Sequence, residues 1–169
     1  MNPFLRTVMM PVILLILTIG LNACDSNSEP SSNQNLPTTA IVNTNAAGLI
    51  TVANPWIRAT APGQTISGAF MTLVNNSETA YALTSVSFSD ASTVEIHETS
   101  MNEGMMRMRK LNQVTIPANG IAELKPGSFH IMLIGLEKDM VAGETETLTL
   151  TFSDDSQKTV EALVGTLRE

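Results

Sequence analysis

Residues 97–132 read HETSMNEGMMRMRKLNQVTIPANGIAELKPGSFHIM, and this stretch shows the pattern that the rest of the folded chain follows. A run with β-branched residues ends at His97, and a polar break containing glycine, residues 101–104, separates it from the run MMRMRKL. Two such runs around a short Gly-containing break are typical of strands joined by a hairpin. The sequence therefore predicts an antiparallel hairpin with a four-residue loop.

The predicted hairpin brings a histidine close to a methionine. If residues 100 and 105 pair across the loop, His97 stands opposite Met108. Directly opposed residues have Cβ atoms roughly 5 Å apart and point to the same face, so this imidazole and thioether could share a bound ion. Three further methionines of the hairpin are near enough to take the place of Met108: Met101, Met105 and Met106.

A second pair of possible ligands lies on the apolar run FHIMLIGL, where His130 and Met132 are two residues apart and so share a face of a strand. A lone histidine or methionine is more often an ordinary core or surface residue. Here, however, both histidines of the chain are offered a methionine by strand geometry. Two imidazoles with thioethers and no thiolate suit Cu(I) and serve Zn, Ca or Mg poorly. The pattern predicts a cuprous site.

Outside this stretch the chain continues as short apolar runs separated by turn sequences such as Ala61-Pro62-Gly63 and Lys125-Pro126-Gly127. No helix longer than one turn is expected. The expected strands span residues 50–60, 66–75, 81–88, 92–98, 105–111, 120–124, 130–136, 146–152 and 158–164. This pattern predicts an all-β domain, an antiparallel Greek-key β-sandwich.

The N-terminal residues 1–23 are expected to be a secretory signal, because a short apolar run follows an early Arg6 and is too short to span a membrane comfortably. Leu21-Asn22-Ala23-Cys24 resembles the bacterial lipobox, which implies that Cys24 is lipidated and anchors the chain. A free thiol or a copper ligand at Cys24 is the alternative. Asp25 resembles the inner-membrane retention signal of enteric bacteria.

Residues 24–49 are rich in Ser, Asn, Thr and Pro, so we expect a lipidated cysteine followed by a flexible linker with a reach of about 25 to 30 Å. Residues 50–169 are then the folded domain, which contains no cysteine and therefore no disulfide. Acidic residues exceed basic ones, 16 to 9, which argues against nucleic-acid binding. No GxSxG or HExxH motif is present, and we expect no enzymatic activity. Three cations, Arg107, Arg109 and Lys110, are predicted to face solvent on the side of their strand away from Met106 and Met108.

The spacing of the four candidate ligands carries a resemblance to a known family. His97, ten residues, Met108, twenty-one residues, His130, one residue and Met132 match the motif of the periplasmic copper chaperones called PCu(A)C. The words NPWIRATAPG, SGAFMTLVN and LKPGSFHIMLIGL are also similar to that family. The resemblance extends over roughly residues 50–163.

The resemblance implies a cupredoxin-like fold and one Cu(I) held by His97, Met108, His130 and Met132. It also implies delivery to an acceptor, the Cu(A) site of cytochrome c oxidase or an assembly partner. We expect a monomer, lipid-anchored on the periplasmic side of a bacterial membrane. Imidazole must be deprotonated to bind a metal, so copper retention should weaken below about pH 6. Some relatives carry a His- and Met-rich tail for Cu(II), whereas this chain ends in VGTLRE.

Two other functions remain open at this point. An electron-transfer cupredoxin would use a blue-copper site of two histidines, a cysteine thiolate and a weak axial methionine. The predicted domain has no cysteine to supply that thiolate. A structural or adhesive lipoprotein, in which His97 and His130 are incidental, would bind no copper.

Overall fold

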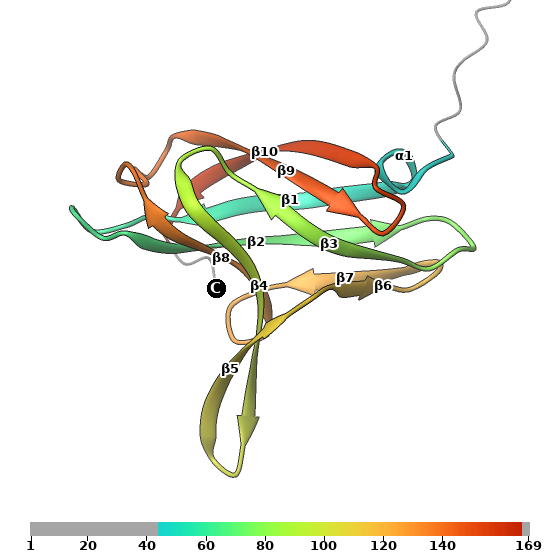
Figure 1. Cartoon of the computed structure of the whole chain (residues 1–169), viewed down its shortest axis with the longest axis horizontal. Helices are drawn as coiled ribbons and strands as arrows, with labels where there is room; N and C mark the ends of the chain where they lie inside the picture. The colour runs from blue at the N-terminus through green and yellow to red at the C-terminus, as the bar shows by residue number, and fades with distance from the viewer. Residues whose placement is uncertain (1–43, 167–169) are drawn as a thin grey trace, which may run out of the picture. The chain divides into compact units, whose positions relative to one another are not determined.

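The structure is a computed structural model that describes residues 44–166 (Figure 1). The predicted signal sequence, Cys24 and most of the predicted linker lie outside the described residues. Across the described range no helix has the length and apolarity that crossing a bilayer requires.

Ten strands and one helical turn make up the described part of the chain. Their bounds are α1 Ala46–Leu49, β1 Ile50–Arg58, β2 Ile66–Asn75, β3 Tyr81–Ser87, β4 Ala91–Asn102, β5 Met105–Leu111, β6 Val114–Ile116, β7 Gly120–Leu124, β8 Phe129–Leu136, β9 Thr145–Phe152 and β10 Gln157–Gly165. All nine predicted strands are confirmed within a few residues at their ends. Strand β6 was not predicted, because its three residues are too few to show a period.

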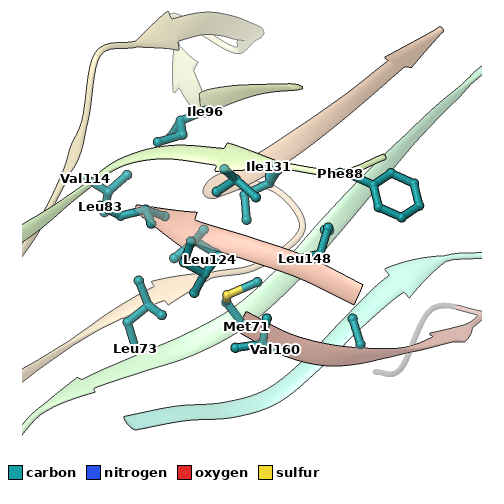
Figure 2. Packing of buried hydrophobic residues seen from close by; sticks show 14 of the residues in the cluster. Met71, Leu73, Leu83, Phe88, Ile96, Val114, Leu124, Ile131, Leu148 and Val160 are labelled. Carbon is teal, nitrogen blue, oxygen red and sulfur yellow. The ribbon is translucent and has the colours of Figure 1, made fainter. Parts of the chain in front are cut away.

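The strands form one hydrogen-bonded sheet in the order β5-β4-β8-β7-β2-β1-β10-β9-β3-β6. Neighbouring strands are antiparallel except for β1 with β10 and β7 with β8, which are parallel. Buried side chains from distant places in this order, such as Ile96 on β4 and Leu83 on β3, meet in one hydrophobic cluster (Figure 2). The sheet therefore curls around a single core, and the predicted all-β class is confirmed.

The folded unit begins before the predicted boundary at residue 50. Ala46 in α1 is completely buried in the core. Its N–H donates to Oδ2 of Asp154 at 2.7 Å, and the N–H of Ala47 donates to Oγ of Ser156 at 2.9 Å. These contacts join the end of the predicted linker to the turn between β9 and β10. Residues 46–49 are therefore part of the domain.

The β4–β5 hairpin projects away from the other strands, as Figure 1 shows. Its loop has two residues, Glu103 and Gly104, with φ of 51° and 75°. The predicted four-residue loop was therefore wrong. Positive φ at both positions is what a type I′ turn requires, and the twist of that turn matches the twist of the strands. The ladder consequently continues to the pair Asn102 and Met105.

The shorter loop changes the predicted register of the hairpin. Lys110, not Met108, stands opposite His97, and Met108 stands opposite Thr99. The register differs from the predicted one by two residues, which is one full period of a strand. A shift of one residue would have moved Met108 to the other face, whereas a shift of two keeps it on the face of His97. The predicted opposition was wrong, but the shared face is correct.

Candidate metal centre

The two histidines stand side by side on neighbouring strands. His97 on β4 pairs directly with His130 on β8, and their ring centroids are 5.9 Å apart. The sequence predicted that both histidines bind one ion, but it did not predict that their strands pair directly. That adjacency follows from the insertion of β8 next to β4 in the sheet order.

A cavity of about 330 Å³ lies beside this pair of imidazoles. Three of the four predicted ligands line it, namely Met108, His130 and Met132, and Met106 joins them. His97 is not part of the lining, although its ring lies next to that of His130. The complete lining is Arg58, Gln64, Ile66, Ser67, Gly68, Phe70, Thr99, Met106, Met108, Pro126, Gly127, His130 and Met132.

His130 is buried, and its orientation is fixed by the backbone. Its Nδ1 lies 3.0 Å from the carbonyl oxygen of Ser128, which also accepts the N–H of Thr99 at 3.0 Å. A carbonyl oxygen can only accept, so Nδ1 carries the proton that is donated to it. In the neutral ring Nε2 then has a free lone pair. His130 can therefore bind a metal through Nε2.

His97 is held in the opposite sense by a carboxylate. Its Nε2–H donates to Oε2 of Glu95 at 2.8 Å, because an ionised carboxylate can only accept. Its Nδ1 is buried and has no hydrogen-bond partner. Buried polar atoms are rarely left unpaired in native structures, so an unpaired nitrogen beside a second imidazole fits an incoming metal ion. A carboxylate that holds the other ring nitrogen is also the usual support of a metal-binding histidine.

Glu95 receives a second hydrogen bond from Nζ of Lys110, at 2.6 Å to Oε1. That bond, followed by the one from His97, lowers the pKa of Glu95 below its ordinary value and keeps it ionised. The prediction that Lys110 lies on the solvent side with the arginines was wrong. Lys110 is an even number of residues from Met108 and so shares its face. Arg109, on the opposite face, contacts Glu98 instead.

Gly68 on β2 pairs across the strands with Met132 and leaves room for the ring of Phe70. A Cβ at Gly68 would come within 3.0 Å of the ring of Phe70. The ring of Phe70 stacks on that of Trp56, with 4.5 Å between the ring centroids, and its centroid lies 6.4 Å from that of the His130 ring. Gly68, Phe70 and Glu95 were not predicted to be parts of the site. Gly68 and Phe70 belong to the word SGAFMTLVN, so only the family resemblance pointed toward them.

The donors gathered here are imidazoles and thioethers. Among residues 44–166 no group of three or more His, Cys, Asp or Glu side chains is placed to hold a metal ion. Met108 is half exposed, Met132 is partly buried and both histidines are largely buried. The arrangement provides two imidazoles and the thioether of Met132 on the packed strands and the thioether of Met108 toward solvent, which is a soft donor set.

Comparison with known proteins shows the family to which the chain belongs. Residues 50–164 match the LpqE-like family, described as "Putative lipoprotein LpqE-like". The chain is 30% identical to "Uncharacterized protein RP573" of Rickettsia prowazekii, with 95% of this chain and 94% of that protein covered. It is 31% identical to "Putative lipoprotein Lxx21020" of Leifsonia xyli subsp. xyli, with 85% and 81% covered.

Solved structures with the same fold include the Cu(I) form of DR1885 from Deinococcus radiodurans. It has a TM-score of 0.60 and 28% identity, with 75% of this chain and 84% of that chain covered. The copper-bound PCuAC domain from PmoF2 has a TM-score of 0.62 and 24% identity, with 73% and 97% covered. The expected cupredoxin-like fold is confirmed by these similarities. The chain belongs to the LpqE-like family and has the fold of the PCu(A)C domains.

Proposed function

We propose that this protein is an extracytoplasmic Cu(I) chaperone that holds one cuprous ion with His97, Met108, His130 and Met132. The observation that carries the proposal is the pair of adjacent imidazoles, each fixed by one acceptor so that its other nitrogen is free. The solved relatives include one with Cu(I) and one described as copper-bound, which supports the same metal here.

Binding and release would use the two kinds of donor differently. The imidazoles are held by the sheet and by Glu95 and the Ser128 carbonyl, so they keep their positions. The thioether of Met108 lies on the exposed hairpin, so an incoming ligand can displace it first. An acceptor with thiolate ligands binds Cu(I) more tightly than neutral donors do, and transfer would then be favourable. No step needs catalysis by the protein.

The acceptor we propose is the Cu(A) site of cytochrome c oxidase or a protein that assembles it. This identity rests on the family resemblance. The lipoprotein names of the family and of the Leifsonia relative support a lipid anchor, which the sequence assigns to Cys24. A tether on the periplasmic side of a membrane would keep the domain near a membrane-bound acceptor.

An anaerobic transfer experiment tests this function. The full chain loaded with Cu(I) is mixed with the copper-free Cu(A) domain of cytochrome c oxidase, the two are separated, and copper is measured in each. We expect most of the copper on the Cu(A) domain, and little when a Cys-free variant of that domain is used. Copper that stays on the chain in both mixtures would contradict a delivery role. An intense blue Cu(II) form would instead indicate electron transfer.

A further inference from the structure

The exposed face of the β4–β5 hairpin carries more thioethers than the proposed Cu(I) site uses. Met101 is 68% exposed, Met106 is 70% exposed and Met108 is 52% exposed. β5 exposes six of its seven residues. Apolar side chains grouped on a projecting hairpin contribute nothing to the core, and such exposed groups often mark a binding function.

The register places these three methionines on one face. Met101 pairs directly with Met106, and Met108 is two residues from Met106 on the same strand. This is the face of His97, and both Met106 and Met108 also line the cavity. Met105 is different, because it pairs with Asn102 and points to the opposite face. The hairpin thus carries a line of thioethers from its tip to the imidazole pair.

We propose that Met101 and Met106 form a second, outer site for Cu(I) at the hairpin tip, through which the ion enters and leaves the inner site. Opposed residues have Cβ atoms about 5 Å apart, and the flexible methionine side chain can bring both sulfur atoms to one soft ion. Met108, a ligand of the inner site, is two residues from Met106 on the same face and can take the ion from the outer site. The outer site lacks an imidazole and is therefore the weaker one. This inference rests on the proposed Cu(I) function.

Titration of the full chain with Ag(I), a redox-stable soft monovalent ion, can separate the two sites when Cys24→Ser removes the one thiol, which would otherwise take the ion first. In this Cys24→Ser chain, methionine methyl groups labelled with ¹³C are followed by NMR without further change, with Met101→Leu and with the matched control Met105→Leu. Met105 is also exposed and adjoins the same turn, but it lies on the other face. The buried Met71 and Met140 report whether each variant is folded.

We expect a second equivalent of Ag(I) to shift the methyl signals of Met101 and Met106 but not that of Met105. Met101→Leu should weaken this second event by about tenfold or more, because one of its two principal donors is lost, whereas Met105→Leu should not. The shift at Met101 should persist in His97→Ala/His130→Ala, in which the inner site is removed.

The outcomes distinguish the two proposals. A single equivalent of Ag(I) that shifts only the methyl signals of Met108 and Met132 would overturn the outer site and leave the proposed function standing. Equal shifts at Met101 and Met105 would show unspecific thioether binding and would also overturn the outer site. A chain that binds no Ag(I) at all would contradict both.

Discussion

The strand β4 has a neighbour on each edge, and the two neighbours differ in character. On one edge β8 packs its apolar residues in the core, and His130 is only 7% exposed. On the other edge β5 packs almost nothing, and Met106 is 70% exposed. His97 on β4, His130 on β8 and Met106 on β5 all lie on the same face of these paired strands. The protein thus combines nitrogen donors held by a packed sheet with sulfur donors that solvent and partners can reach.

This difference suggests a division between holding an ion and exchanging it. Groups fixed by packing and hydrogen bonds lose little freedom when an ion binds, whereas exposed thioethers can be replaced one at a time. Variants of β4, β5 and β8 can test that division.

The largest effect should appear in folding stability. Ile131→Ala removes a completely buried side chain from β8 and should lower the free energy of unfolding by about 2 to 5 kcal/mol. Met106→Ala on β5 should change it by no more than about 0.5 kcal/mol, because nothing packs there. Urea unfolding followed by circular dichroism measures both. Similar losses in the two variants would mean that the hairpin is part of the core.

Affinity for Cu(I), unlike folding stability, should depend on a side chain of the hairpin. Met108→Leu keeps the size and apolarity of the side chain but removes the sulfur, and should weaken Cu(I) binding by about 10- to 100-fold. Met105→Leu, on the opposite face of β5, should have no effect. Anaerobic competition with a chromogenic chelator measures both variants. If Met105→Leu weakened binding as much, the assignment of faces would be wrong.

A smaller effect is expected from the carboxylate that holds His97. Glu95→Ala frees Nε2 of His97 and should lower Cu(I) affinity by about tenfold, because the ring loses the contact that fixes its tautomer. Glu98→Ala is the control, since Glu98 lies on the same strand but contacts Arg109 on the opposite face. Equal Cu(I) affinities in the two variants would show that Glu95 does not support the metal site.

The smallest effect should be at the N-terminal turn, far from the site. Burial raises the pKa of Asp154, but hydrogen bonds from Ala46 and Ser156 outweigh this and leave it below the ordinary value of 3.8. The stabilisation is thus present above that value and lost as pH falls through the lower pKa of the folded state. Asp154→Asn should cost about 1 kcal/mol at neutral pH and reduce the acid dependence of unfolding. An unchanged acid profile would contradict this.

Much of the fold followed from local sequence. Apolar runs bounded by Pro-Gly and Asn-Gly turns located nine strands, and period-two alternation put Met132 on the face of His130. The register of the hairpin did not follow, because a polar break of four residues allows a loop of either two or four. The structure has the two-residue loop, in which Glu103 takes a positive φ. The α1 turn was missed since Ala46 is buried by contacts with residues far along the chain.

The candidate ligands were predictable as residues but not as an arrangement. The adjacency of His97 and His130 depends on β8 entering the sheet beside β4, and no local pattern encodes that step. The choice of ring nitrogen depends on Glu95 and on the Ser128 carbonyl, which become partners only when the strands are paired. Side-chain contacts across strands therefore had to come from the structure.

Anaerobic Cu(I) titration of the full chain, with Cys24→Ser to remove the one competing thiol, and of the same chain with His97→Ala or His130→Ala tests the imidazole pair most directly. A chromogenic Cu(I) chelator serves as competitor, and circular dichroism confirms that each variant is folded. The wild type should take one tightly bound Cu(I), and each single variant should bind it more than about 100-fold more weakly, since a ligand is lost and not only its support. Wild-type affinity in either variant would show that the imidazole pair is not the copper site.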